Sequence, residues 1–253
     1  MILLIDIGNT SIAIGIQDRN EIKALFRMKT VCNGRSHEEI AYIMQGVIRN
    51  HHAGDPDGAA LCSVVPAVTP MVVRALNESF NINPLCVSSS VATGLKFLIK
   101  NPEELGADRI ANAAAAYHRY KDDVIVVDFG TATTICAVTD KGEYTGGAIM
   151  PGIALCARML GEETARLPTI ELKAPDTVLG KTTEENIRSG VVVGHAGAVE
   201  RIIEDIKIER GKNFTVIATG GYGDLVTPYI SSIDSINPHL TLEGLNYIYE
   251  LNS

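Results

Sequence analysis

The sequence predicts an α/β protein that is built from two related lobes, each with a mixed β-sheet. The first observation is an internal repeat, because residues 2–14 (ILLIDIGNTSIAI) and 124–138 (VIVVDFGTATTICAV) share an apolar run that stops at an Asp, then a glycine and a Thr-containing turn. Their aspartates, Asp6 and Asp128, lie 122 residues apart (128 − 6), near half of the 253 residues. Strand-like and helix-like segments also alternate in both halves, which is typical of sheets covered by helices. We therefore expect an N-terminal lobe at 1–117 and a C-terminal lobe at 118–253.

The composition is that of a folded protein with a net negative charge. Hydrophobic residues make up 46%, and 22 Lys plus Arg against 30 Asp plus Glu give −8. There is no basic run, so we expect no nucleic-acid partner, and a few placed cations must meet any anionic substrate. The apolar start is too short for a signal peptide, and no later segment has the length of a membrane span. We expect a cytoplasmic protein without a membrane partner.

The first half predicts three strands followed by a helix, then a strand, a helix and a short strand. Extended runs at 2–8, 12–17 and 22–28 precede Ser36-His-Glu-Glu39, a capping box that opens the first helix, and residues 18–20 form a turn between the second and third runs. A strand at 59–65 leads to Thr69-Pro70, which opens a helix to about Phe80. A short strand at 85–87 follows.

The second half repeats this plan after an Ala-rich helix that begins near Asp108. We expect extended runs through 125–138 and 144–149, a helix at 153–160, a strand at 214–218, and helices at 224–230 and 241–251. A long helix from Thr183 to about Lys207 has Gly190, Gly194 and Gly197 on one face. Each glycine costs about 1 kcal/mol against Ala in a helix interior, so this face is expected to pack closely on another backbone, in the core or at a dimer interface.

The two Asp-containing turns have the chemistry of a phosphate site. An Asp at a strand end can hold a hydrated cation, while backbone N–H groups and Thr hydroxyls bind phosphoryl oxygens. Two facing copies would then hold one nucleotide from both sides. The alternative is that each copy is only a hairpin turn, but the repetition at half the chain length favours the nucleotide interpretation.

Two further patterns resemble nucleotide motifs without matching them. Gly180-Lys-Thr resembles the end of a P-loop, but Pro175 stands where that motif needs a glycine. Gly221-Tyr-Gly223 resembles a dinucleotide fingerprint, but Val226 occupies the third glycine position. These two glycines either let a flat base or ribose approach the backbone or simply form a strand-to-helix turn.

The cysteines and histidines give no metal-binding pattern. The five cysteines (Cys32, Cys62, Cys86, Cys136 and Cys156) stand apart without CxxC spacing, so we expect reduced core thiols. The six histidines, with the His51-His52 pair in a polar loop, are expected to be solvated.

Gly106-Ala-Asp-Arg109 is the strongest candidate for catalysis. Asp108 alone is typical of a helix N-cap. A carboxylate at a helix start also stays ionised and can accept a hydroxyl proton, and Arg109 can pair with a substrate carboxylate. Both roles are compatible, since the carboxylate has two oxygens.

The chain resembles type III pantothenate kinases over nearly its whole length. The resemblance rests on an ordered set of segments: Asp6-Ile-Gly-Asn-Thr10, Gly106-Ala-Asp-Arg109, Asp128-Phe-Gly-Thr-Ala-Thr-Thr134, Gly146-Gly147 with Pro151-Gly-Ile153, Gly180-Lys-Thr-Thr183 and Ala218-Thr-Gly-Gly221. It implies two ribonuclease-H-like lobes of the actin-like ATPase fold, with a nucleotide cleft between them. The implied reaction is ATP-dependent phosphorylation of pantothenate to 4′-phosphopantothenate, the first step of coenzyme A biosynthesis.

The resemblance also implies a role for each site residue. Asp108 would be the catalytic base, and the substrate would be held by Gly106, Ala107, Asp108, Arg109 and Thr183, in a site built at a homodimer interface. Asp6 would hold Mg²⁺, and Asp128 would hold a monovalent cation, K⁺ or NH₄⁺. The ATP phosphates would be bound by Thr131 and by the first turn: Asp6, Ile7, Gly8, Asn9, Thr10, Ser11, Ile12 and Ala13.

One position departs from the family pattern, and two other functions compete with pantothenate phosphorylation. Ile99 stands where the family often has a Tyr that helps to enclose pantothenate; this bears on how the substrate is enclosed, whereas phosphate binding is expected to be unaffected. The first competitor is a kinase of the same fold with another small acceptor, against which the Gly106–Arg109 match argues. The second is a non-catalytic regulator similar to the Bvg accessory factor, against which the retained carboxylates argue.

Overall fold

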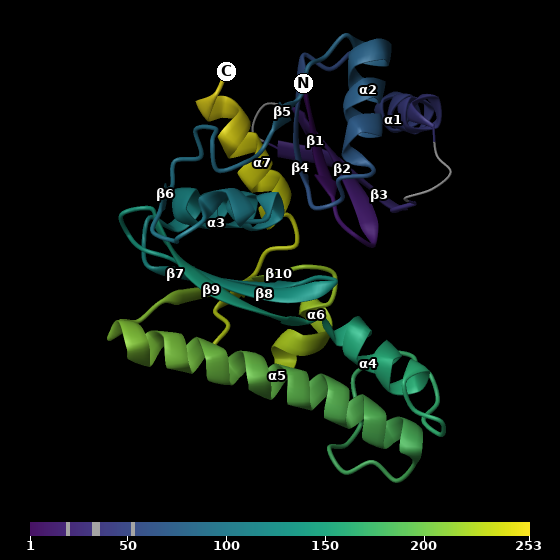
Figure 1. The fold of residues 1–253 in the computed structure, drawn as a ribbon, viewed down its shortest axis with the longest axis vertical. Coiled ribbons are helices and arrows are strands. Elements are labelled where there is room, and N and C mark those ends of the chain that lie inside the picture. The colour runs from purple at the N-terminus through teal and green to yellow at the C-terminus, as the bar shows by residue number, and fades with distance from the viewer. Residues whose placement is uncertain (19–20, 32–35, 52–53) are drawn as a thin grey trace. The chain divides into compact units, whose positions relative to one another are not determined.

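The computed structural model describes residues 1–18, 21–31, 36–51 and 54–253 (Figure 1). Cys32, His52 and residues 19–20 of the predicted turn lie outside the described residues. The chain divides into two compact units, Met1–His118 with Leu240–Ser253, and Arg119–His239. These units agree with the expected lobes except at the C-terminal end, where the last helix belongs to the first unit. The predicted domain limits themselves stay a prediction.

The first unit contains one sheet in the order β3-β2-β1-β4-β5. Strand β1 runs antiparallel to β2 and parallel to β4. Its strands and helices are β1 (Ile2–Ile7), β2 (Ser11–Asp18), β3 (Glu21–Lys29), α1 (His37–Asn50), β4 (Gly58–Ser63), α2 (Thr69–Phe80), β5 (Leu85–Cys86), β6 (Lys96–Phe97), a 3₁₀ turn (Pro102–Glu104), α3 (Ala107–Tyr120) and α7 (Leu240–Leu251).

Alternation along β1 separates two hydrophobic cores in this unit. Leu3, Ile5 and Ile7 belong to a cluster with buried residues of α1 and α2, which lie side by side in Figure 1. Leu4 points the other way and belongs to a cluster with α3 and α7. Successive side chains of a strand point to opposite faces, so Asp6 lies on the Leu4 face, the face covered by α3 and α7.

The second unit repeats the arrangement of the first. Its strands run in the order β11-β10-β7-β8-β9, with β7 antiparallel to β8 and parallel to β10, as β1 is to β2 and β4. Helices α4 and α5 contribute to its hydrophobic cluster. The elements are β7 (Val124–Phe129), β8 (Ala132–Val138), β9 (Glu143–Pro151), α4 (Ile153–Glu162), α5 (Thr183–Arg210), β10 (Thr215–Thr219), α6 (Gly223–Val226), a 3₁₀ turn (Thr227–Tyr229) and β11 (Ser235–Ile236). The expected α/β class and the repeat are confirmed.

Capping residues fix the starts of two helices, α1 and α5, and both starts agree with the sequence. The Ser36–Glu39 capping box is present with both of its hydrogen bonds. Helix α5 begins at Thr183 after a second capping box and ends at Arg210, followed by the C-cap Gly211, whose φ of 61° favours glycine. Of the helices described, none is both long and apolar enough to span a bilayer.

Two expectations for the second half were wrong in detail. The segment predicted as one helix at 224–230 is a short α-helix followed by a 3₁₀ turn, with Pro228 inside that turn. The glycines of α5 do not pack against a backbone within the chain, because no described atom beyond the helix's own backbone lies within 4 Å of a Cβ built on Gly190, Gly194 or Gly197. All three are exposed, which leaves the dimer alternative open.

Candidate active site

The first Asp-containing turn closes the β1–β2 hairpin and is tied to the end of β3. The Gly8 amide donates to the Ser11 carbonyl at 3.0 Å. The Thr30 hydroxyl donates to the Gly8 carbonyl at 2.6 Å, and the Thr30 amide donates to the Thr10 carbonyl at 3.0 Å. Asn9 and Thr10 remain exposed. The segment is therefore a hairpin turn that also presents polar groups to solvent, and the two interpretations of the sequence do not exclude each other.

Asp6 stands beside Cys62, because β1 and β4 pair in register at these two residues. The Cys62 thiol donates to Asp6 Oδ1 at 3.4 Å. Burial raises the pKa of Asp6 to about 6; the Cys62 hydrogen bond opposes this, Asp108 adds to it, and Arg27 opposes it. Burial and the two carboxylates hold the pKa of the Cys62 thiol well above its ordinary value, so the thiol stays protonated and acts as a donor.

Asp108 reaches the same place from the first turn of α3. The helix begins at Ala107, so Asp108 is inside it and is not the N-cap that its residue type favoured. Its Oδ1 accepts the Arg109 amide at 2.7 Å. Burial raises the pKa of Asp108, against the opposing Arg109 amide and charge. A Cβ on Gly106 would lie 2.6 Å from that Oδ1, so the glycine leaves the space that the carboxylate occupies.

In the second unit two glycines hold the second Asp-containing turn. Gly220 has φ of 92°, and a Cβ on it would lie 2.5 Å from Asp128 Oδ1. The Gly152 amide donates to the Thr131 carbonyl at 3.1 Å, and a Cβ on Gly152 would lie 2.5 Å from the Gly130 carbonyl oxygen. Gly220 therefore packs on the carboxylate and Gly152 on the turn, while Thr131 is exposed.

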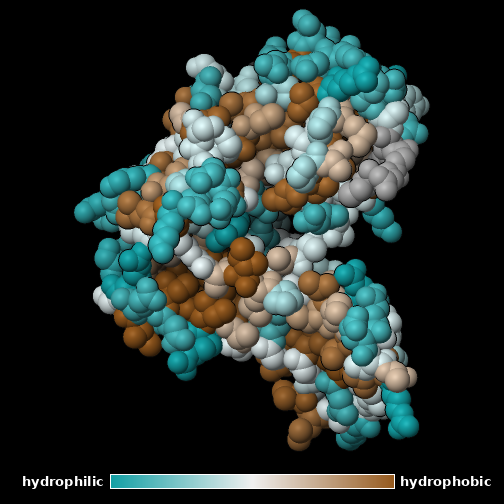
Figure 2. All heavy atoms as spheres, in the orientation of Figure 1, coloured by the Kyte–Doolittle hydropathy of each residue, from teal (hydrophilic) through white to brown (hydrophobic). Residues whose placement is uncertain are grey.

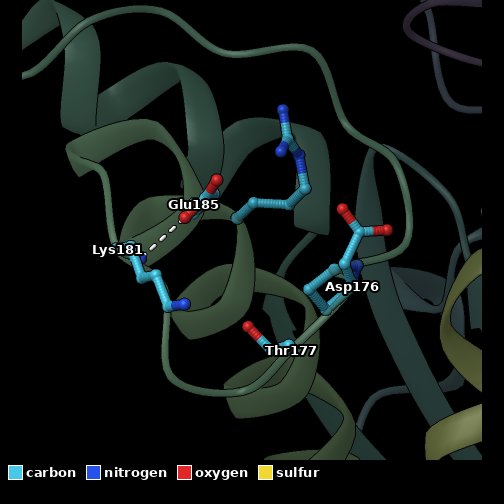
Figure 3. A pocket seen from close by; sticks show the side chains of 6 residues that line it. Asp176, Thr177, Lys181 and Glu185 are labelled. Carbon is cyan, nitrogen blue, oxygen red and sulfur yellow. Dashed lines mark hydrogen bonds between the residues drawn. The ribbon is translucent and has the colours of Figure 1, made fainter.

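Thr183 begins α5, and residues before and after it in the sequence line a small pocket (Figure 3). The Lys181 amide donates to Glu185 Oε2 at 2.6 Å, and buried Arg188 donates to Glu184 at 2.7 Å. The lining residues are Pro175, Asp176, Thr177, Lys181, Glu185 and Arg188. Gly180 of the apparent P-loop packs against the first turn of α5, so it serves the helix start, and Thr183 itself is exposed.

The structure thus brings Asp6 and Asp108 together in the first unit, and Asp128 and Thr131 in the second. Cys62 and Thr30 also belong to the site of the first unit, and the sequence analysis missed both. Cys62 lies on β4, the strand paired with β1, and Thr30 directly follows β3, so strand register was the signal that could have found them. Among the described residues no group of three or more His, Cys, Asp or Glu forms a metal site.

Comparisons with known proteins agree with this geometry. A model of the family described as type III pantothenate kinase matches residues 2–205. The chain belongs to the type III pantothenate kinase family. A type III pantothenate kinase from Agathobacter rectalis is 40% identical over 252 residues, which cover 98% of this chain and 96% of the relative.

Two solved structures show the same fold at low sequence identity. A protein from Campylobacter jejuni assigned to the Baf family of transcriptional activators has a TM-score of 0.62 at 20% identity, covering 98% of this chain and 97% of its own. An inorganic polyphosphate/ATP-glucomannokinase from Arthrobacter sp. strain KM has a TM-score of 0.52 at 15% identity, covering 99% and 97%. The expected fold is confirmed. Family membership makes the chain a pantothenate-phosphorylating phosphotransferase of coenzyme A biosynthesis, with ATP as the phosphoryl donor.

The role of Gly220 predicts a defined loss of stability. Gly220→Ala forces a side chain into a positive φ and against the Asp128 carboxylate, so the free energy of unfolding should fall by about 1–3 kcal/mol. Urea unfolding measures this change. Gly221→Ala is the matched control, because a Cβ there meets no described atom within 4 Å. Equal stability of the two variants would contradict the packing of Gly220 on Asp128.

The raised pKa of Asp6 predicts that this carboxylate destabilises the ligand-free protein at neutral pH. The pKa of Asp6 is 3.8 when unperturbed and about 6 in the fold. The contribution of Asp6 to the free energy of unfolding is therefore most favourable below pH 4 and is lost as the pH rises through 6. Asp6→Asn should therefore raise the free energy of unfolding at pH 8, by about 1–3 kcal/mol, and change it little at pH 4. Urea unfolding at both values checks this, and a gain that is independent of pH would contradict it.

Proposed function

We propose that this kinase transfers the γ-phosphoryl group of ATP to the primary hydroxyl of pantothenate, with Asp108 as the base. The pantothenate oxygen forms the new P–O bond, the bond to the β-phosphate oxygen breaks to give ADP, and the hydroxyl proton passes to Asp108. The observation that supports this assignment is the placement of Asp108, in the first turn of α3, close enough to Asp6 for their charges to interact.

Arg109 and the start of α3 are proposed to hold pantothenate. Arg109 follows Asp108 directly, and its guanidinium can pair with the substrate carboxylate through two parallel hydrogen bonds. Gly106 and Ala107 have small side groups or none, so in this proposal pantothenate lies close to the start of α3. Phosphoryl transfer generally has a loose transition state, so alignment of the hydroxyl by Asp108 contributes more than early proton removal.

Mg²⁺ fits the chemistry of Asp6. One carboxylate oxygen accepts the Cys62 thiol, and no cationic side chain within the described residues forms an ion pair with Asp6. Mg²⁺ typically binds to one or two carboxylates together with substrate phosphates, and it would neutralise charge on the transferring group. In this proposal Asp6 orients the metal, and residues 7–13 with Thr131 bind the phosphates.

A monovalent cation, K⁺ or NH₄⁺, is proposed at Asp128. This carboxylate is partly exposed near the end of β7 and offers oxygen donors to a cation. Gly220 packs on the carboxylate and so keeps its position fixed. That both turns hold the same nucleotide stays a prediction from the repeat.

A homodimer and a cytoplasmic location complete the proposal. The exposed glycine face of α5 and the apolar side chains Val178 and Leu179, which are 66% and 85% exposed, support an interface in the second unit. Figure 2 shows hydrophobic side chains at the surface of the region that holds α4 and α5. The four described cysteines are free thiols, which suits a reducing compartment. Thr183 would bind substrate at the dimer interface.

Asp108→Asn tests the catalytic base. The amide cannot accept the hydroxyl proton, so we expect kcat to fall at least about 100-fold while the fold is retained. A coupled assay with ATP, Mg²⁺ and pantothenate measures the rate, and circular dichroism checks the fold. Glu103→Gln, an exposed change in the 3₁₀ turn just before α3, is the matched control. A near-normal rate for Asp108→Asn would remove Asp108 from the mechanism.

The cation at Asp128 is tested by exchanging the salt. The same assay should give activity in K⁺ or NH₄⁺ and little in Na⁺, because the smaller ion fits the same oxygen donors poorly. Asp128→Asn should abolish the difference between K⁺ and Na⁺. Equal rates in all three salts would refute a monovalent cation at this site and leave the transfer reaction itself intact.

A further inference from the structure

Strand β3 brings two cationic side chains next to the first phosphate-binding turn. Arg27 is the register partner of Ala13, and Lys29 is the register partner of Ser11. Ala13 in turn pairs with Asp6 across β1 and β2. Arg27, Ala13 and Asp6 therefore form one row across three neighbouring strands, and register partners in a sheet present their side chains on the same face.

Packing of the sheet confirms which face this is. Leu4 and Leu25 belong to the cluster with α3 and α7, and each lies two residues before Asp6 and Arg27 respectively. The alternation of strands puts Asp6, Arg27 and Lys29 on that same face. The methyl group of Ala13 is the only side chain between Arg27 and Asp6 in the row, so the long guanidinium side chain has room to extend toward the turn.

The positive charge of Arg27 acts to lower the pKa of Asp6. Burial dominates the raised pKa of Asp6, and the positive charge of Arg27 opposes it. Arg27 and Lys29 are both exposed, and within the described ranges neither forms an ion pair, whereas Lys23 at the far end of β3 pairs with Asp18 at 2.8 Å. Two cations that form no ion pair among the described residues, in a chain of net charge −8, are available for an anion beside the turn.

We propose that Arg27 binds the triphosphate of ATP and that Lys29 adds a second positive charge at the same turn; this inference rests on the proposed function. The guanidinium group donates two parallel hydrogen bonds to phosphoryl oxygens, whereas Lys29 acts as a point charge. Thr30, one residue further, holds the Gly8 and Thr10 carbonyls. The end of β3 thus both fixes the turn and supplies the positive charge that the turn lacks.

A different role for these cations is protection of a sheet edge. β3 is the first strand of its sheet, and charged residues on edge strands prevent pairing with other chains. That role requires charge anywhere along β3, whereas nucleotide binding requires it at the two positions beside the turn. The two roles therefore predict different results for Arg27 and Lys23.

Binding of ATP, ADP and adenosine to the full-length protein separates the two roles. For Arg27→Ala we expect the dissociation constants of ADP and of a non-hydrolysable ATP analogue, measured by calorimetry, to rise about tenfold or more, and that of adenosine to stay unchanged. Arg27→Lys should show an intermediate loss, and Lys29→Ala a loss of about threefold. Lys23→Ala is the matched control from the same strand and should bind all three ligands like the wild type.

Steady-state kinetics give a second measure that a structural defect would not reproduce. Arg27→Ala should raise the KM for ATP about tenfold and leave the KM for pantothenate within about twofold. Arg27→Gln, which keeps a polar side chain but removes the charge, should behave like Arg27→Ala if charge is what matters. Unchanged affinity for the ATP analogue in both variants would overturn the proposal, and aggregation with unchanged affinity would assign Arg27 to edge protection.

The experiment also distinguishes this proposal from the pantothenate assignment. If the wild type binds ATP but does not phosphorylate pantothenate, the substrate assignment fails and the calorimetry still tests Arg27. If pantothenate is phosphorylated and Arg27→Ala keeps wild-type affinity and KM for ATP, only the role of Arg27 is refuted.

Discussion

Two carboxylates of like charge, Asp6 and Asp108, are held close together on the partly buried α3 face of the first sheet. Burial raises the pKa of both residues, and the charge of Asp108 adds to the shift of Asp6, so the ionised forms are unfavourable in the absence of a cation. Three features of the fold offset the unfavourable free energy of these two partly buried carboxylates. These are the Cys62 thiol in register with Asp6, the Arg109 amide on Asp108, and the space beside Gly106 that the Asp108 carboxylate fills.

The second unit has the same strand order as the first, but its Asp-containing turn has different neighbours. Its turn carries Asp128, and the backbone of Gly220 packs on the carboxylate while that of Gly152 packs on the turn. This contrast agrees with the proposed division of labour, in which one turn orients the metal and the phosphates and the other holds a monovalent cation. The common topology accompanies the sequence repeat, whereas the neighbours of each Asp differ between the two units.

Local features of the sequence predicted the parts of the structure that depend on neighbouring residues. Capping boxes at Ser36 and Thr182 fixed two helix starts, and the repeat located both aspartates. The sequence failed where a property depends on residues that are distant in the chain. Cys62 and Thr30 joined the site through strand register. Asp108 proved to be inside the helix because α3 begins at Ala107, two residues earlier than an Asp108 cap requires. The open face of the α5 glycines depends on what packs there.

The last helix of the chain has a consequence for how the protein is made. Helix α7 packs on β1 and β4, and its Leu242, Leu245 and Ile248 complete the same cluster as Leu4. A ribosome delivers residues 1–118 long before residue 240, so one apolar face of the nascent first unit lacks α7, and of its two helices has only α3 to cover it, through the synthesis of the entire second unit. The cluster around Leu4 is therefore completed only when residues 240–251 have emerged.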